Sequence, residues 1–360
     1  MNKDSKIYVA GHKGLVGSAI YENLMAQGYS NLIVKSKDEL DLTNGVAVQQ
    51  YFETEKPEFV FLAAAKVGGI AANHTYRADF IYENLMIQNH VIHQSYLHGV
   101  KKLLFLGSTC VYPKNAPQPI KEESLLMGEL EYTNEPYAIA KIAGMKMCES
   151  YNIQHGTNFI SVMPTNLYGP RDNFDFDSSH VLPALLRKIH LGKLLENNNW
   201  DAIRKDLNLL PVNGVNGNQP QENILNALKN VGIDYHQNKT TIEIWGSGKP
   251  RREFLWSEDL ADACVFIMNT LNFSDCISDT KEIKNSHLNI GTGSDISISD
   301  LAVLIKNETG FMGDFTYNTE KPDGTIRKLT DVGKLSSLGW KSKRTLEAGL
   351  RELYKWYIDR

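Results

Sequence analysis

Short apolar runs alternate with longer amphipathic stretches through the first half of the chain. Runs of this length are typical of buried strands, and they occupy residues 6–10, 32–34, 59–63, 103–106 and 159–162. Apolar residues recur at helical spacing over residues 15–27, 79–98 and 136–155. Strands separated by helices need right-handed parallel crossovers. The pattern therefore predicts an α/β fold with a doubly wound parallel sheet of the Rossmann type.

The second half of the chain is less regular. The pattern predicts a helix over residues 181–194, strands over 241–245 and 288–290, and further helices from about residue 258. We therefore expect a Rossmann domain over residues 1–168, to which residues of about 241–268 return, and a smaller C-terminal α/β domain over 169–360.

An insertion is expected within the second domain, at about residues 191–240. The chain between residues 197 and 239 is rich in Asn and Gln, and it contains Pro211, Gly214, Gly217 and Pro220. Apolar residues still recur there at helical spacing, as at Ile203 and Leu207. This pattern indicates a subdomain with short helices rather than a flexible linker.

Composition narrows the class of protein. Apolar residues make up 42% and charged residues 22%, which are ordinary globular values. A net charge of −4 and a pI near 6.2 give no electrostatic basis for binding nucleic acid or an anionic membrane. No apolar run approaches the ~18 residues of a membrane span, and the first residues lead into a strand rather than a signal peptide. The four cysteines have no Cys-x-x-Cys spacing, which favours a reduced, cytoplasmic protein without a disulfide framework or metal site.

Glycines mark the turn after the first predicted strand. The turn reads Gly11-His12-Lys13-Gly14-Leu15-Val16-Gly17. Glycine is needed where the chain turns tightly, where backbone approaches a pyrophosphate, and where a helix packs on a sheet. The N–H groups and dipole of the following helix attract phosphate. In this strand–turn–helix context the turn predicts a dinucleotide site, with an ordinary strand-to-helix turn as the alternative.

Lysines follow the second predicted strand, where an NAD-specific site usually places Asp or Glu for the ribose hydroxyl. Lys35 and Lys37 stand there instead, and Lys13 adds a third cation from the glycine turn. Because cations attract a 2′-phosphate, NADPH is favoured over NADH. Solvated surface lysines are the alternative.

Tyr137 and Lys141 are four residues apart in a predicted helix, so their side chains share one face. We expect the cation to lower the tyrosine pKa from about 10, which makes the phenol a usable acid or base near neutrality. Ser108 follows a strand, at the edge where open α/β sheets bind ligands. Tyr-x-x-x-Lys alone is more often an ordinary helix face, but the three residues together predict carbonyl–alcohol chemistry, with Ser108 as the polarising hydroxyl.

Longer blocks of sequence resemble a known family. They are Ala63-Ala-Ala-Lys-Val-Gly-Gly-Ile70, Gly107-Ser-Thr-Cys-Val-Tyr-Pro113, Thr133-Asn-Glu-Pro-Tyr-Ala-Ile-Ala-Lys-Ile-Ala-Gly144, Met163-Pro-Thr-Asn-Leu-Tyr-Gly-Pro170, Trp245-Gly-Ser-Gly248, Arg252-Glu-Phe254 and Lys321-Pro-Asp-Gly-Thr325. In these blocks the chain resembles the extended short-chain dehydrogenase/reductases of the nucleotide-sugar branch, and among them the GDP-L-fucose synthases. The resemblance covers most of the chain.

The resemblance implies that Cys110 and His180 are an acid/base pair that inverts carbons 3 and 5 beside a 4-keto group, through an enolate. A thiol with a pKa near ~8.5 and an imidazole with a pKa near ~6.5 suit such proton transfers. Without the resemblance, core packing of Cys110 and a satisfied hydrogen bond at His180 are the simpler interpretations.

The resemblance also implies the binding residues. Contacts to NADPH fall on the residues of the glycine turn, Lys37, Leu106, Gly107, Ser108, Thr109, Lys141, Pro164, Thr165, Asn166, Leu167 and His180. Contacts to a GDP-sugar fall on Lys188, Trp245, Arg252 and Asp323. Cations suit a diphosphate and an indole suits stacking or a ribose contact. Lys188 stands where arginine is expected, which keeps the charge but loses the bidentate fork.

The expected protein is an NADPH-dependent epimerase-reductase that converts a GDP-4-keto-6-deoxymannose-type sugar to GDP-L-fucose or a close analogue. A homodimer is expected from the resemblance. Three alternatives remain. One is a GDP-4-keto-sugar C4-reductase, for example of a heptose, that lacks its own epimerase activity and serves surface polysaccharide synthesis. The others are a 4,6-dehydratase, which consumes no net NADPH, and an inactive NADP-binding protein.

The insertion motivates the heptose alternative. Residues 191–244 lie between His190 and Trp245, and they separate the expected binding residues Lys188 and Trp245. This stretch is longer than the resemblance leads us to expect. The extra chain could cap the sugar pocket, change sugar specificity, form a subunit interface, or be a surface excursion, since long loops cost only slowly growing entropy.

Overall fold

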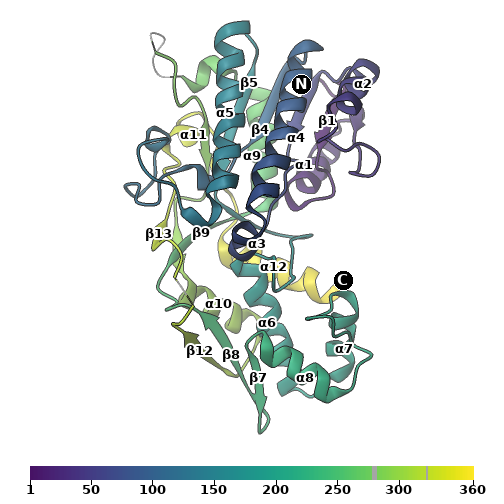
Figure 1. Cartoon of the computed structure of the whole chain (residues 1–360), viewed down its shortest axis with the longest axis vertical. Helices are drawn as coiled ribbons and strands as arrows, with labels where there is room; N and C mark the ends of the chain where they lie inside the picture. The colour runs from purple at the N-terminus through teal and green to yellow at the C-terminus, as the bar shows by residue number, and fades with distance from the viewer. Residues whose placement is uncertain (278–281, 322) are drawn as a thin grey trace.

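A six-stranded parallel sheet forms the upper part of the molecule, which contains the N-terminus (Figure 1). The computed structural model describes residues 1–277, 282–321 and 323–360. The strand order is β10-β5-β4-β3-β1-β2. These strands are β1 (Ile7–Ala10), β2 (Leu32–Ile33), β3 (Phe59–Leu62), β4 (Lys102–Leu106), β5 (Phe159–Pro164) and β10 (Leu288–Ile290). All neighbouring strands pair in parallel, so the predicted doubly wound sheet is confirmed.

Helices cover both faces of this sheet because its strands are apolar on both sides. Ile7 and Val9 of β1 belong to a core shared with α1 (Leu15–Ala26) and α9 (Ser257–Thr270). Tyr8 and Ala10 belong to the opposite core, shared with α2 (Gly45–Glu55), α4 (Arg77–Leu97) and α5 (Glu135–His155). The alternation of side chains along a strand produces this division. The carboxyl ends of the strands, and with them the candidate site, face the lower part of the molecule.

Two smaller sheets belong to the second half of the chain. One has the order β12-β8-β7 and the other β11-β9-β13, with β6 also paired to β9. Their strands are β6 (Asn166–Tyr168), β7 (Ile233–His236), β8 (Lys239–Trp245), β9 (Arg251–Trp256), β11 (Asp295–Ser297), β12 (Asp314–Asn318) and β13 (Arg327–Lys328). The sheet around β9 therefore joins four distant stretches of chain between the upper and lower parts (Figure 1).

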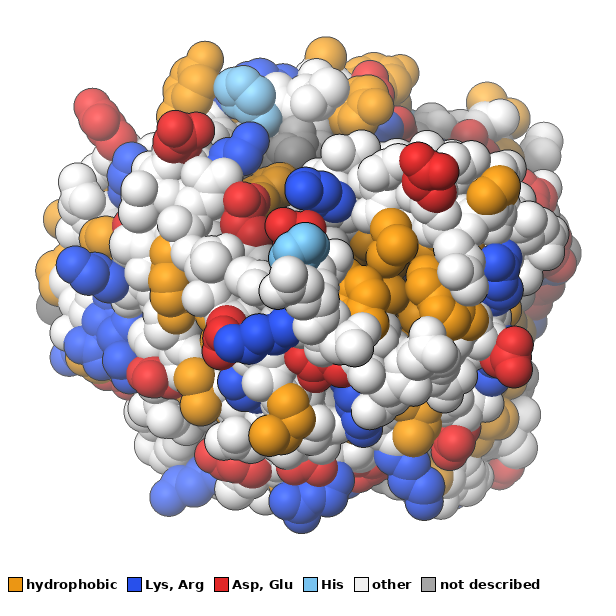
Figure 2. Space-filling model, turned by 90° about the horizontal axis from the view of Figure 1, so that it is seen from below, with side chains coloured by type: hydrophobic (Ala, Val, Ile, Leu, Met, Phe, Trp, Pro, Cys, Tyr) orange, Lys and Arg blue, Asp and Glu red, His pale blue; other side chains and the backbone are white. Residues whose placement is uncertain are grey.

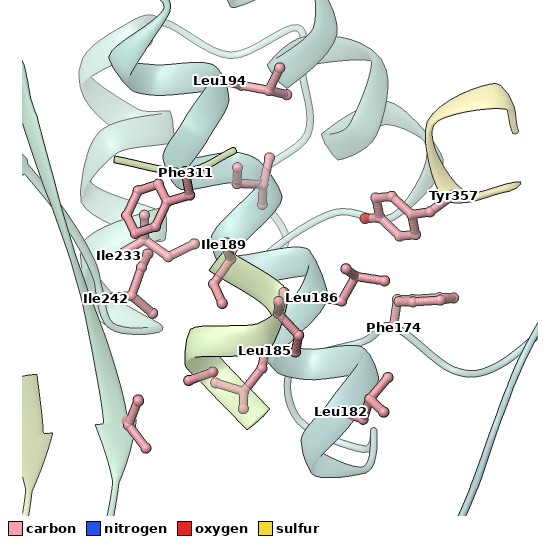
Figure 3. Close-up of a cluster of buried hydrophobic side chains, with 14 of the residues drawn as sticks. Phe174, Leu182, Leu185, Leu186, Ile189, Leu194, Ile233, Ile242, Phe311 and Tyr357 are labelled. Atoms are coloured by element: carbon pink, nitrogen blue, oxygen red, sulfur yellow. The ribbon is translucent and has the colours of Figure 1, made fainter. Parts of the chain in front are cut away.

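The helix α6 (Val181–Glu196) runs through the core of the lower part (Figure 3). Leu182, Leu186 and Ile189 are fully buried there, and the same core includes residues of α10 (Ile298–Thr309) and α12 (Leu346–Asp359). A helix that is buried on nearly all sides is held rigidly by packing. The candidate residue Lys188 lies on this helix and His180 directly precedes it.

The inserted segment contains the short helices that the sequence predicts, α7 (Trp200–Leu209) and α8 (Gln221–Asn230). Ile203 and Leu207 of α7 are fully buried in the same core as α6. Asp206 accepts a hydrogen bond from Arg187 Nε at 3.0 Å and another from the Tyr357 hydroxyl at 2.5 Å. Buried apolar packing and a buried ion pair make this segment part of the core of the lower part, so it is not a flexible linker.

The chain returns to the upper part more than once. Within residues 241–268, β8 lies in a lower sheet, whereas α9 packs with α1 in the upper core. β10 adds the sixth strand of the large sheet. The remaining short helices are α3 (Ile70–Thr75), α11 (Gly333–Ser337) and the 3-10 turns η1 (Thr109–Val111), η2 (Glu122–Ser124), η3 (Tyr132–Asn134) and η4 (Phe273–Cys276).

Seen from below, the lower part carries acidic and basic side chains side by side, with a group of hydrophobic side chains right of the centre and smaller ones elsewhere (Figure 2). This face has no continuous field of one sign, in keeping with the net charge of −4. Among the residues the structure describes, no helix has the length and apolar character that crossing a membrane requires.

Candidate active site

The glycine turn joins β1 to α1 at the carboxyl edge of the large sheet. Gly11 has φ +87°, and a Cβ there would lie 2.8 Å from the backbone nitrogen of Ala64. A Cβ at Gly17 would lie 2.1 Å from the Gly11 carbonyl oxygen, so both positions need glycine. Gly14 caps α1 without a side-chain hydrogen bond, which leaves the first N–H groups of the helix available to an anion. These features fit the pyrophosphate of a dinucleotide.

Two lysines lie where an adenosine 2′-phosphate would be recognised. Lys37 is exposed and its ammonium is 3.9 Å from Glu83. Lys35 is also 3.9 Å from its acidic neighbour, Glu39. Pairs this long on the surface are weak. Both ammonium groups can therefore turn to a phosphate, which fits NADP.

Ser108 and Cys110 meet just beyond the end of β4. The Cys110 N–H donates a hydrogen bond to Ser108 Oγ at 3.3 Å, and this bond caps η1. Cys110 is only 6% exposed, and burial raises the pKa of its thiol. Lys328, Ser108 and Lys141 act in the opposite direction. The thiol is thus buried but surrounded by groups that stabilise its thiolate.

Tyr137 and Lys141 lie one turn apart on α5, whose first turn contains Pro136. Lys141 Nζ donates a hydrogen bond to the Leu106 carbonyl at 2.9 Å and lies 5.7 Å from the centre of the Tyr137 ring. Burial lowers the pKa of Lys141 to about 8. The pKa of half-buried Tyr137 is raised, first by burial and then by the charge of Cys110. The expectation that Lys141 lowers it is wrong here, because desolvation outweighs the attraction of an ammonium that bonds Leu106 instead.

His180 is the second member of the expected acid/base pair. It precedes α6, and its exposed side chain forms no hydrogen bond within the described ranges 1–277, 282–321 and 323–360. Desolvation lowers the pKa of its imidazole. The Ser178 carbonyl accepts the Gly69 N–H at 2.9 Å, which ties this segment to the loop that follows β3.

The segment predicted to line the nicotinamide is anchored to β9. Thr165 Oγ1 and Asn166 Nδ2 donate to the Glu253 carbonyl at 3.3 and 2.9 Å. The fully buried Glu253 carboxylate accepts N–H groups of Thr292 at 2.6 Å and of Thr330 at 3.0 Å. The strand that carries Arg252 and the cofactor-lining segment are therefore held in one hydrogen-bonded unit.

The predicted GDP-sugar residues gather around the end of β8. Trp245 is 56% exposed, and Lys188 Nζ lies 5.7 Å from the centre of its indole. Arg252 Nη1 donates to the Thr325 carbonyl at 2.6 Å. The Asp323 carboxylate accepts the Ser247 N–H at 2.8 Å, which places it beside the turn after Trp245. An exposed indole with cations nearby can bind a nucleoside and its phosphates.

Sequence reasoning missed two lysines at this site. Lys328 pairs with Arg252 in the β13–β9 register, and it is the cation that most opposes the rise in the Cys110 pKa. Within the described part of the chain, the Lys328 ammonium forms no hydrogen bond or ion pair, and burial lowers its pKa. Lys321 Nζ lies 5.3 Å from the centre of the Trp245 indole, the ring that Lys188 also approaches. In the sequence both look like surface lysines, although Lys321 begins the Lys321–Thr325 block and Lys328 follows it by three residues.

Metal ligands are not grouped in this part of the molecule. Over the described residues, no set of three His, Cys, Asp or Glu side chains is placed to hold a metal ion. The four cysteines are all buried free thiols.

Comparison with known proteins gives full-length matches. The model of the NAD dependent epimerase/dehydratase family matches residues 7–210 and 207–291. GDP-L-fucose synthase 1 of Arabidopsis thaliana is 49% identical over 357 residues, which cover 99% of this chain and 94% of the plant protein.

Two solved structures from Campylobacter jejuni are also similar over nearly the whole chain. A GDP-6-OMe-4-keto-L-xylo-heptose reductase is 51% identical with a TM-score of 0.93, covering 100% of this chain and 99% of the other. A GDP-mannoheptose C4 reductase with NADP bound is 51% identical with a TM-score of 0.86, covering 99% of each chain.

Proposed function

Because the chain belongs to the NAD dependent epimerase/dehydratase family, we propose that it is an NADPH-dependent oxidoreductase acting on a GDP-4-keto sugar. The proposed substrate is of the GDP-4-keto-6-deoxymannose type, and the product is GDP-L-fucose or a close analogue. The grouping of Ser108, Cys110, Tyr137 and Lys141 beyond β4 carries this proposal. These residues supply a hydroxyl, a thiol, a phenol and an ammonium, which are the groups that reduction of a ketone and inversion beside it require.

Reduction uses the protonated phenol. When bound, NADPH supplies the hydride to the ketone carbon. The Ser108 hydroxyl orients the ketone oxygen, and Tyr137 gives its proton to that oxygen as negative charge develops there. Burial raises the pKa of Tyr137, so the phenol holds this proton at neutral pH. Lys141 then stabilises the tyrosinate until it is protonated again.

Inversion beside the ketone precedes reduction in the proposed sequence. The ketone acidifies the neighbouring C–H groups, because the electrons of the broken bond enter an enolate. Cys110 and His180 remove and return protons on carbons 3 and 5. The cation of Lys328 opposes the rise in the Cys110 pKa and so supports the thiolate that acts as base.

The diphosphate of the substrate meets cations around Trp245. Lys188 and Arg252 supply two positive charges, and the exposed indole offers a face to the nucleoside. Asp323 is held beside this indole by Ser247 and can accept a sugar or ribose hydroxyl. The reaction is assigned to the cytoplasm, where buried free thiols persist, and to a homodimer, which light scattering of the purified protein tests.

A C4-reductase without its own epimerase activity is the second candidate. The two heptose reductases, each 51% identical to this chain, favour it. Both candidates share the reduction, so they differ only in what Cys110 and His180 do.

One experiment tests both candidates. NADPH oxidation is followed with a panel of GDP-4-keto hexoses and heptoses, and the products are identified by NMR. The same substrates are held with enzyme in D₂O without NADPH. Deuterium at carbons 3 and 5 is expected for the epimerase-reductase, and its absence with continued reduction identifies the C4-reductase. The absence of NADPH oxidation with every member of the panel would contradict the proposed function.

A further inference from the structure

The inserted segment reaches the Lys188 side chain. Gly232 lies between α8 and β7 with φ +82°. A Cβ at this position would lie 3.2 Å from Lys188 Nζ and 2.8 Å from Glu243 Cβ. The Gly232 carbonyl also accepts the Glu243 N–H at 2.7 Å, which binds this turn to β8. The backbone of Gly232 is therefore a close wall beside the Lys188 ammonium.

Lys188 has few partners for a buried cation. Its side chain is 8% exposed, and its ammonium donates one hydrogen bond, to the Glu243 carbonyl at 3.3 Å. The indole of Trp245 lies 5.7 Å away. No carboxylate forms an ion pair with Lys188 within the residues that the structure describes. A nearly buried ammonium so poorly compensated favours binding of an anion, and burial lowers its pKa to about 8.

Resting on the proposed GDP-sugar site, we propose that the inserted segment forms part of the diphosphate site. The backbone of Gly232 limits the space beside the Lys188 ammonium and so keeps it near Trp245. The same limit favours lysine over the larger arginine at position 188. A guanidinium is wider and longer than an ammonium, so it cannot occupy the space between Gly232 and Trp245 without moving one of them.

The same segment also holds the helix that carries Lys188. The neighbouring residue, Arg187, is fully buried and pairs with Asp206 of α7 at 2.9 Å. Its guanidinium also donates to carbonyls of Phe174 and Leu210. The insertion thus fixes α6 through Arg187 and bounds the Lys188 side chain through Gly232. One contact holds the helix that carries Lys188, and the other bounds the Lys188 side chain itself.

A matched pair of glycine variants tests this proposal. Gly214 lies in the same insertion with φ +77°, but a Cβ there would meet no atom within 4 Å. Gly232→Ala and Gly214→Ala therefore carry similar backbone strain, and only the first brings a Cβ against neighbouring atoms, which are Glu243 Cβ and Lys188 Nζ. Binding of GDP alone is measured by calorimetry, after thermal unfolding shows that both variants are folded. We expect Gly232→Ala to weaken GDP binding at least about tenfold and Gly214→Ala to bind like the wild type.

Steady-state kinetics gives a second readout. Gly232→Ala is expected to raise KM for the GDP-sugar and to leave kcat nearly unchanged, because Lys188 lies at the diphosphate and not at the ketone. Equal GDP affinity in the two glycine variants would overturn the proposal.

Lys188→Arg tests the selection of lysine, and it serves even if Gly232→Ala fails to fold. The variant keeps the charge, yet we expect it to bind GDP as weakly as Lys188→Met. An affinity equal to that of the wild type would overturn the role of the wall. A wild-type protein that binds no GDP also overturns it. A protein that binds GDP but reduces no GDP-4-keto sugar contradicts only the proposed reaction.

Discussion

Lys141 lies 5.7 Å from the centre of the Tyr137 ring but donates its hydrogen bond to the Leu106 carbonyl. The phenol is therefore not ionised by its neighbour. Burial raises the pKa of Tyr137, and the phenol keeps its proton at neutral pH. A protonated phenol is the group that reduction of a ketone needs, so the pair is arranged for acid catalysis.

Tyr137→Phe should remove this acid. We expect kcat for NADPH oxidation to fall about 10²–10⁴-fold, the usual contribution of a positioned general acid. NADPH binding, followed by fluorescence titration, should change little because only a hydroxyl is lost. Tyr132→Phe is the control, since that side chain is exposed on η3. Unchanged turnover would remove Tyr137 from the mechanism.

Lys141→Met should lose turnover but gain free energy of unfolding. Burial lowers the pKa of Lys141 from 10.5 to about 8. At pH 7 the folded state therefore carries a buried positive charge, and burying this charge lowers the free energy of unfolding. This cost is fully present below pH 8 and is relieved as pH rises towards 10.5, because there the unfolded chain binds more protons.

The variant lacks that cost and loses one hydrogen bond to Leu106. We expect its free energy of unfolding at pH 7, without NADPH, to rise by about 1–3 kcal/mol. The gain should shrink at pH 10, while turnover is lost at both pH values. Urea denaturation measures the stability. A variant less stable than the wild type at pH 7 would contradict the assignment.

Lys328→Met should move the pH dependence of proton exchange. Burial raises the pKa of Cys110, and Lys328 is the main group that opposes this rise. Removing the cation raises the thiol pKa further, so less thiolate is present at a given pH. Deuterium incorporation at carbons 3 and 5 should therefore shift to higher pH. Lys121→Met, at an exposed position, is the control, and Cys110→Ser should abolish exchange. An unchanged pH dependence of deuterium incorporation would show that Lys328 does not affect the pKa of Cys110.

Asp206→Ala should destabilise the lower part of the molecule. Its carboxylate accepts bonds from Arg187 and from the Tyr357 hydroxyl, and Arg187 is fully buried. Breaking a buried pair leaves an uncompensated charge and costs about 3–5 kcal/mol. Asn208→Ala on the exposed side of α7 should cost little. Equal urea midpoints for the two variants would show that the insertion is not anchored through this pair.

Sequence patterns predicted the large sheet well, because the spacing of apolar residues that marks a strand or a helix involves only residues close together along the chain. The strand predicted over residues 288–290 is β10, and the helix predicted over 136–155 differs from α5 only by beginning at Glu135. Strand β2 ends at Ile33, one residue before the prediction, because such boundaries depend on pairing partners. The short helices of the insertion also appear, since helical spacing survives in a polar segment.

The candidate site was predicted less completely. Tyr137 and Lys141 share a face because helix geometry dictates it, but the direction of the tyrosine pKa shift depended on burial, which spacing does not reveal. Lys328 was missed because its role depends on the pairing of β13 with β9.

The sequence by itself determined the strands of the large sheet, the need for glycine at the turn after β1, and the residue types for carbonyl reduction. These depend on interactions between residues close together along the chain. Only the tertiary structure decided that Lys328 supports Cys110 and that Gly232 of the insertion bounds Lys188. Such contacts join segments far apart in sequence, and they depend on how the whole core packs. The identity of a lysine or a glycine in the sequence therefore does not reveal them.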